Sequence, residues 1–312
     1  MKHTSVTIIL FVSMVLAGCP VAKKSIESVR LKLNLEKQKT YTYSLNTHFD
    51  MEMLMMSQKI GTGLDMDYRY LLNLDKIDSA GNTVLRSTIG DVKMKADVMG
   101  MSMGYDSRER VDTSHQDPMS ANIRRMFAGM LGKTFQVTLS PSGEIQNIAG
   151  LEDIVTGMTN NLPGDEQDKA GMKDKLNESL NQQQIRQAFG QVFNLYPDKP
   201  VKIGDHWKRE VALGIKGMNS NQAITYTVSD ITPDKVVLDL KGEIRSSTDK
   251  QLTDSTNKLP VMNGSEAGTI SIDRTSGLAT SGSIDLNIKG EITLQGKKSP
   301  VDIKGKIIIG NK

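Results

Sequence analysis

The sequence predicts an α+β protein that is mainly antiparallel β, with two β-rich halves and a central helical segment packed on the sheet. Apolar and polar residues alternate over long stretches in both halves, which is typical of strands with one buried face. Clusters of turn-forming residues separate these stretches, and between about residues 118 and 195 the apolar period lengthens toward that of a helix. An apolar sheet face and apolar helix stripes must cover one another. An incomplete barrel around the helices would satisfy the same requirement.

Composition excludes several classes of protein. The chain has 312 residues, of which 38% are apolar and 4% aromatic, with one cysteine, 18 methionines and a net charge of +3. A single cysteine forbids an internal disulfide and a zinc site built on several thiolates. The 39 basic and 36 acidic residues leave no concentrated basic surface, so we expect no nucleic-acid partner.

The N-terminus has the features of a secretory signal peptide, predicted over residues 1–18. Lys2 and His3 precede an apolar run, 6–16, that is short for a membrane span. The run ends in Leu16-Ala17-Gly18-Cys19, which resembles the lipobox of bacterial lipoproteins. The resemblance implies that signal peptidase recognises Leu16, Ala17 and Gly18, and that the Cys19 thiol receives a diacylglyceryl group.

A lipid on Cys19 would make residues 19–29 a linker to a membrane. Because each buried methylene contributes about 0.8 kcal/mol, several acyl chains such as palmitate hold a protein on a membrane surface. The segment after Cys19 lacks an acidic cluster of the kind that directs some lipoproteins to the cell exterior. We therefore expect a cell-envelope protein, anchored in the outer membrane and facing the periplasm.

The first β-rich half is predicted over residues 30–117. Its clearest alternation places apolar side chains at every second position, at Leu64, Met66, Tyr68, Tyr70, Leu72 and Leu74. The cluster Ser79-Ala80-Gly81-Asn82 has the composition of a hairpin turn.

The central segment is predicted over residues 118–200. Apolar residues at helical spacing indicate a short helix from Met119 to Leu131, another from Leu151 to Met158, and a longer one from Met172 to Phe193. Tyr196-Pro197 ends the last of these patterns. One β-hairpin, 134–148, is predicted between the first and second helices, and its turn is the Ser-Pro-Ser-Gly sequence.

The second β-rich half, 201–312, repeats the order of units seen in the first. Turns at Pro233-Asp234 and at Arg274 to Gly277 separate its strands, and alternation is cleanest from Ile284 onward. Internal duplication and one long meander are both compatible with this order.

The order of lipobox, β-rich half, helices and second half beginning near Lys202-Ile203-Gly204-Asp205-His206-Trp207 resembles an uncharacterised family of Gram-negative envelope lipoproteins, known as a domain of unknown function. The resemblance covers most of residues 30–310 and implies no activity. A more distant, fold-level analogy is with periplasmic lipoprotein carriers, whose incomplete barrel shelters acyl chains.

No catalytic motif stands out, so we expect a protein that is not an enzyme and needs no cofactor. His48, His115 and His206 remain after removal of the signal peptide, and none has ligands at metal-site spacing. The sequence also lacks a Walker loop and a dinucleotide fingerprint.

The most distinctive feature of the sequence is the spacing of its methionines. Two alternating groups, each expected to project from one sheet face, form the candidate ligand or metal face: Met51, Met53, Met55, Met99, Met101 and Met103. Thioethers suit Cu(I) or Ag(I), flexible methionine side chains also line adaptable apolar grooves, and methionine can replace Leu and Phe in an ordinary core.

The functional expectation is a lipid-anchored protein of non-catalytic binding type that shelters a hydrophobic ligand such as an acyl chain. The alternatives are an interaction or scaffold module for another envelope protein, and methionine-based binding of Cu(I) or Ag(I).

Overall fold

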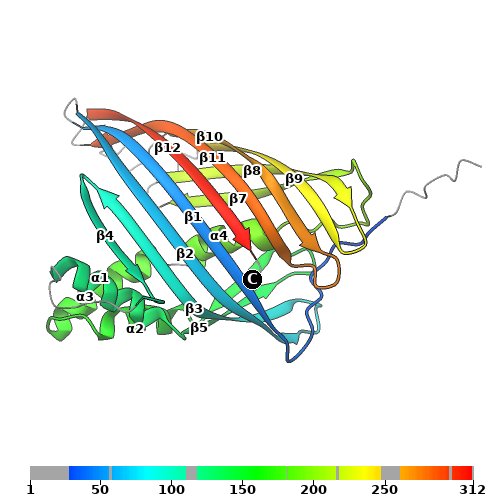
Figure 1. Ribbon diagram of the computed structural model, residues 1–312, viewed down its shortest axis with the longest axis horizontal. Coiled ribbons are helices and arrows are strands. Elements are labelled where there is room, and N and C mark those ends of the chain that lie inside the picture. Colours follow the sequence, from blue (N-terminus) through cyan, green and yellow to red (C-terminus); the bar gives the residue numbers. More distant parts are fainter. Residues whose placement is uncertain are drawn as a thin grey trace, which may run out of the picture.

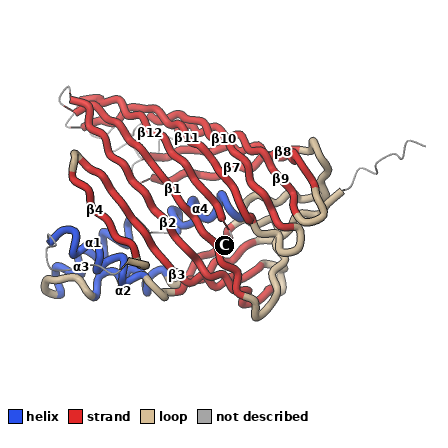
Figure 2. Tube along the Cα trace, viewed as in Figure 1, coloured by secondary structure: helices blue, strands red, loops and turns tan. Residues whose placement is uncertain are grey.

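The computed structural model describes residues 28–55, 58–109, 118–180, 182–215, 218–246, 261–294 and 297–310. These residues form one open antiparallel sheet of twelve strands and four helices (Figure 1, Figure 2). The prediction of a mainly antiparallel β protein is confirmed. Leu16, Ala17, Gly18 and Cys19, on which the lipobox prediction rests, lie outside the described residues.

The first half contributes four strands that run as a meander. They are β1 (Thr40–Met55), β2 (Gln58–Ile77), β3 (Thr83–Val98) and β4 (Met101–Asp106). The predicted turn between β2 and β3 is present, and Gly81 has the positive φ of 81° that this turn requires. Asp78 closes the same turn, because its carboxylate accepts hydrogen bonds from the Ala80 and Asn82 backbone N–H groups.

The central segment holds the helices and the predicted hairpin. The elements are α1 (Pro118–Met130), β5 (Thr134–Leu139), β6 (Ile145–Ala149), α2 (Leu151–Asn160), α3 (Glu166–Ser179) and α4 (Gln182–Phe193). The expectation of one long helix from Met172 to Phe193 is wrong, because α3 ends at Ser179 and α4 begins at Gln182. The apolar stripe explains the division: its steps of four residues end at Leu180, and the next step to Ile185 is five.

The second half adds six strands. They are β7 (His206–Ile215), β8 (Met218–Ile231), β9 (Lys235–Ser246), β10 (Val261–Asp273), β11 (Ala279–Leu294) and β12 (Lys297–Gly310). The sheet order is β6-β5-β3-β2-β1-β12-β11-β10-β9-β8-β7, and β4 pairs with β3. The two halves are therefore joined where β12 pairs with β1. Internal duplication stays a prediction.

The helix α4 links the two edges of this sheet. It contacts both β6 and β7, the strands at opposite ends of the order. Figure 1 shows α4 behind β1 and β2, on one face of the curled sheet. We call this face, which also carries Tyr43 and Leu72, the inner face, and the opposite one the outer face.

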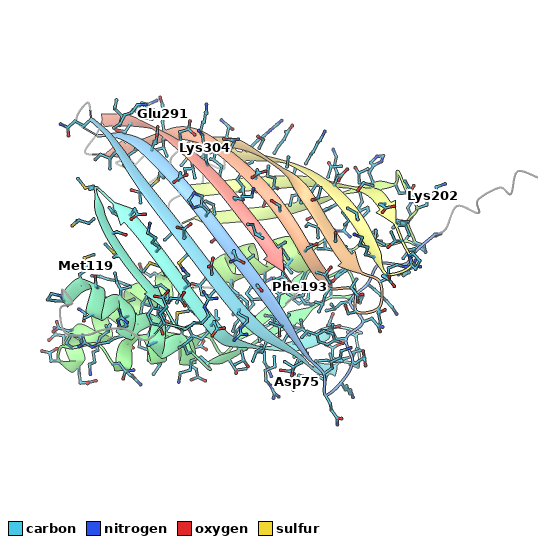
Figure 3. All side chains as sticks on the ribbon, in the orientation of Figure 1. Asp75, Met119, Phe193, Lys202, Glu291 and Lys304 are labelled. Atoms are coloured by element: carbon cyan, nitrogen blue, oxygen red, sulfur yellow. The ribbon has the colours of Figure 1, made fainter. Side chains whose placement is uncertain are left out.

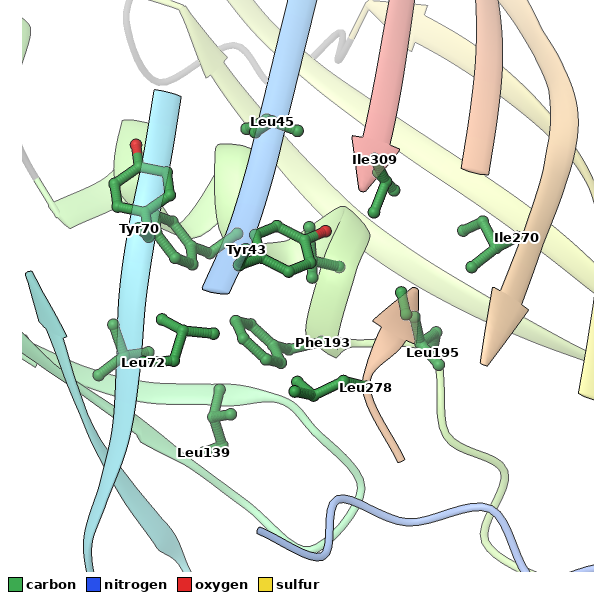
Figure 4. Close-up of a cluster of buried hydrophobic side chains, with 14 of the residues drawn as sticks. Tyr43, Leu45, Tyr70, Leu72, Leu139, Phe193, Leu195, Ile270, Leu278 and Ile309 are labelled. Atoms are coloured by element: carbon green, nitrogen blue, oxygen red, sulfur yellow. The ribbon is translucent and has the colours of Figure 1, made fainter. Parts of the chain in front are cut away.

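Packing is dense at one end of the strands. There the inner-face residues Tyr43 and Leu72 lie with Phe193 of α4 and Leu139 of β5 in one buried cluster (Figure 4). Rings from the sheet and helix meet edge to face, with 5.1 Å between the centroids of Tyr70 and Phe189. Figure 2 shows the helices toward the lower part of the sheet, away from the upper ends of β1 and β12.

Candidate functional site: the inner face of the sheet

The inner face is apolar along the full length of β1 and β2, but its burial changes midway. On β1, Tyr41, Tyr43 and Leu45 are buried, whereas Phe49, Met51 and Met53 at the same parity are partly exposed. On β2, Leu72 is 1% exposed and Leu64, eight residues away on the same face, is 37% exposed. The helices and β5 thus bury one half of this face and leave the other half accessible.

We call the accessible half the methionine face. Its members share inward parity on neighbouring strands and are all at least partly exposed: Phe49, Met51, Met53, Leu64, Met66, Met101 and Met103. Met66 stands directly opposite Met94 in the β2–β3 ladder. Of the predicted candidate residues, four therefore lie on one face: Met51, Met53, Met101 and Met103.

Two predicted candidates are placed differently. Met99 is not on a sheet face: it lies in the turn between β3 and β4, with φ 51°, and its side chain is 68% exposed. The Met99-Gly100 pair reverses the chain there, so the alternation stops before Met101. Met55 ends β1, and its side chain lies outside the described residues.

The sheet register keeps the two methionine groups apart. Met51 on β1 is in line with Thr62 on β2, Val98 on β3 and Met101 on β4. With about 4.8 Å between strands, the Met51 and Met101 backbones are about 14 Å apart along the sheet. This arrangement spreads the thioethers over an apolar surface. Within the residues that the structure describes, no group of three or more His, Cys, Asp or Glu side chains is arranged to hold a metal ion.

The outer face is polar and carries a histidine site that sequence reasoning missed. His48 Nδ1 lies 2.5 Å from Asp65 Oδ1 on β2, and His48 Nε2 lies 3.0 Å from Asp50 Oδ2. These hydrogen bonds, the one to Asp65 first, raise the pKa of His48 above its ordinary value. Asp50 is visible in the sequence as an alternate residue on the same strand. Asp65 becomes a neighbour only through the β1–β2 register.

A hollow of about 400 Å³ lies beside this histidine site, lined mainly by outer-face residues that include Asp50, Glu52, Asp97, Asp302 and Lys304. Figure 3 shows Lys304 and Glu291 toward the upper end of the strands, away from Phe193. The carboxylates nearby are partly balanced by lysines, since Lys95 pairs with Asp97 at 2.8 Å. These are ordinary ion pairs of a solvated sheet face.

Among the described residues, one further histidine, His206, is exposed at the beginning of β7. His115 lies outside the described residues. Among the described helices, none combines the length and apolar character that a membrane-crossing segment needs.

Solved structures share the strand arrangement only distantly. A lipovitellin structure, described by its lipid–protein interactions, is 11% identical with a TM-score of 0.47, covering 89% of this chain and 25% of that one. The translocator domain of the autotransporter NalP from Neisseria meningitidis is 7% identical with a TM-score of 0.21, covering 88% and 90%. The chain thus spans a quarter of the lipovitellin chain, and these scores carry no argument about function.

Sequence families give a firmer result. No curated protein matches the sequence. The family described as DUF6263, a family of unknown function, matches residues 80–279, which is more than half of the 312 residues. The expected resemblance to an uncharacterised domain is confirmed, while the lipoprotein part of that expectation stays a prediction. The chain belongs to the DUF6263 family of unknown function.

Proposed function

We propose that this protein is a lipid-anchored envelope protein that binds the alkyl chain of a lipid on the methionine face and acts without catalysis. One observation carries the proposal: a single apolar sheet face is buried at one end and accessible at the other. Leu72 and Leu64 mark the two ends on β2, at 1% and 37% exposure. Apolar surface that its own fold leaves uncovered favours a hydrophobic partner.

The dimensions of the methionine face suit one alkyl chain. From Phe49 to Met53 the strand rises about 13 Å, and from β1 to β4 the sheet extends about 14 Å. A bilayer hydrocarbon core is about 30 Å thick, so a chain of one leaflet extends about 15 Å. Each methylene moved from water onto this face contributes about 0.8 kcal/mol.

The chemistry of the lining supports an aliphatic ligand. Methionine has three rotatable bonds and a polarizable sulfur, so a methionine-lined surface adapts to chains of different length and saturation. Ile288 and Ile303 continue the same face beyond Met51 and are also partly exposed. On the outer face of β12, by contrast, the charged residues Asp302, Lys304 and Lys306 follow one another.

Two leucines of equal exposure provide a matched test of the ligand face. Leu64 points inward and is 37% exposed, whereas Leu54 points outward and is 38% exposed. We would titrate the mature polypeptide, 19–312, made without the signal segment so that Cys19 is unacylated, with a fluorescent long-chain fatty acid. L64E should weaken binding at least about tenfold, because a charge on an apolar site costs more than about 1.4 kcal/mol.

L54E should leave the affinity within about twofold, since Leu54 faces the solvent on the other side of β1. Equal losses in L54E and L64E would contradict a ligand site on the inner face. Absence of saturable binding to the wild-type protein would remove the proposal and leave the two alternatives, an interaction or scaffold module and methionine-based binding of Cu(I) or Ag(I).

The anchor rests on the Leu16-Ala17-Gly18-Cys19 motif and needs its own test. Growth of the native host with labelled palmitate should label the wild-type protein and leave C19S unlabelled. Membrane fractionation should then recover C19S away from the membranes that hold the wild type. A labelled C19S protein would contradict acylation at this cysteine.

A further inference from the structure

A buried polar pair lies on the inner face of β8 and β10. Gln222 on β8 is in register with Ile244 on β9, and Glu266 on β10 is in register with Gly242 on β9 and Leu286 on β11. Gln222 is 1% exposed and Glu266 is 4% exposed. The Gln222 Nε2–H donates a hydrogen bond of 2.5 Å to Glu266 Oε1. The sequence signal for this pair is the charged residue Glu266 at a position where the alternation places side chains on the inner face.

The pair is incompletely hydrogen-bonded. Neither Gln222 Oε1 nor Glu266 Oε2 has a hydrogen-bond partner among the described residues. A buried polar atom without a partner destabilises the fold, so its retention calls for a ligand or a structural reason. The Glu266 side chain lies over Gly242, where a Cβ would overlap it. Burial raises the pKa of Glu266, and the Gln222 hydrogen bond opposes part of that rise.

The sheet register connects this pair to the methionine face. Glu266 is in line with Leu286, Gly305, Phe49 and Leu64 across four strand spacings, about 19 Å along the sheet. Gln222 begins the adjacent line, which runs through Ile244, Gly264, Ile288 and Ile303 to Met51. A chain about 15 Å long with its tail on Phe49 and Leu64 therefore ends near Glu266 and Gln222.

The two unpartnered oxygens define the head group. Gln222 Oε1 can only accept a hydrogen bond, whereas Glu266 Oε2 accepts when ionised and donates when protonated. A hydroxyl donates one hydrogen bond and accepts others, so it satisfies both oxygens when Glu266 is protonated: it donates to Gln222 Oε1 and accepts from the Glu266 Oε2–H. A ligand carboxylate has only acceptors, so it would leave Gln222 Oε1 without a donor.

We propose that Gln222 and Glu266 form the head-group subsite of the ligand site and select an alkyl lipid that ends in a neutral hydroxyl. This inference rests on the proposed function and names its ligand class. The alkyl chain lies along the line from Leu286 to Leu64. The hydroxyl donates to Gln222 Oε1 and accepts a hydrogen bond from the protonated Oε2 of Glu266.

Three probes with the same chain test the subsite. Hexadecanol, hexadecyl methyl ether and hexadecanoate would each displace a fluorescent long-chain probe from the mature polypeptide, 19–312. The wild type should bind hexadecanol about fivefold to tenfold more tightly than the ether, because the ether cannot donate the hydrogen bond to Gln222. Hexadecanoate should bind more weakly than hexadecanol at neutral pH.

Q222M and E266M keep unbranched side chains of similar length. Q222M should reduce the preference for hexadecanol over the ether to less than about twofold, whereas E266M should weaken the binding of both probes, because both accept a hydrogen bond from Glu266. E243M is the matched control, since Glu243 lies on the outer face of β9 with its side chain 66% exposed, and it should keep the wild-type preference. Circular dichroism and urea unfolding would establish that each variant is folded.

The outcomes separate the two proposals. Equal binding of hexadecanol and the ether by the wild type would overturn the hydroxyl subsite while leaving alkyl-chain binding intact. A preference that persists in Q222M would also overturn it. If none of the probes displaces the fluorescent chain, the proposed function itself fails.

Discussion

His48 on the outer face should make stability depend on pH. Hydrogen bonds to Asp65 and Asp50 raise its pKa above 6.5 in the folded chain, so folding favours the protonated ring. The stabilisation is therefore fully present below about pH 6.5 and disappears as pH rises through the folded pKa. Because the side chain is half exposed, the effect should stay below about 1 kcal/mol.

Urea unfolding of wild type and H48N at about pH 5.5 and pH 8.5 measures this effect. The wild type should be the more stable protein at the lower pH, and the difference should vanish at the higher pH. An NMR titration should show a larger fall in the His48 pKa for D65N than for D50N. A difference that grows with pH would contradict the assignment.

Gly143 in the β5–β6 turn should tolerate no side chain. Its φ is 86°, and a Cβ there would overlap the Phe193 carbonyl oxygen at the end of α4. Gly132 has a similar φ of 71° with nothing within 4 Å of a Cβ, so it is the matched control. G132A should cost about 1 kcal/mol, and G143A at least about 2 kcal/mol more, as measured by urea unfolding. Equal costs for G132A and G143A would show that the positive φ alone, and not the contact with Phe193, determines the loss of stability.

At the scale of elements, local sequence patterns predict where strands and turns lie, but they do not predict which strands pair with one another. Alternation fixes which side chains of β1 and β2 share a face, because side-chain direction in a strand depends only on parity. Parity even marks Glu266 and Gln222 as inward polar residues. It contains no information on the pairing of β12 with β1, which joins Leu45 to Ile309 across most of the chain. For the same reason, the contact between His48 and Asp65 could not be predicted, because it depends on the register of β1 with β2.

The helix α4 should depend on an arginine that ties it to the edge of the sheet. Arg186 Nη2 donates to the Gln146 carbonyl at 2.7 Å, and Nη1 donates to the Ile145 carbonyl. R186L leaves two β6 carbonyls without this donor and should cost about 1.5–3 kcal/mol. Hydrogen exchange of α4 peptides should accelerate in the same variant.

Arg125 on α1 provides the control for this prediction. It donates to Asn122 of its own helix, so R125L should change stability by less than about 0.5 kcal/mol. If R125L and R186L behave alike, the contact between α4 and β6 is not what holds the helix.

At the scale of the whole molecule, one curled sheet has two different ends. The outer face is mostly polar, although Leu54 and Ile308 are exposed on it, whereas the inner face passes from a packed core to an accessible apolar surface within single strands. Tyr43 and Met51 lie on the same face of β1, yet only Tyr43 is covered by Phe193, with 6.5 Å between their ring centroids. The alternating sequence is the same in both places, so only the helices and the path of the sheet separate the buried core from the accessible apolar surface.

This division predicts that a Leu-to-Ala substitution on β2 lowers the free energy of unfolding much more at the buried end than at the accessible end. Leu72 is fully packed against the helices, so L72A should lower the free energy of unfolding by about 2–5 kcal/mol. Leu64 shares its face but is 37% exposed, so L64A should cost less than about 1 kcal/mol. Urea unfolding of both variants without lipid makes the comparison. Similar large costs would mean that the methionine face is ordinary core, as the low aromatic content of the chain also allowed. A small cost for L64A, together with weaker binding of the fatty-acid probe, would identify a surface kept apolar for its ligand and not for the fold.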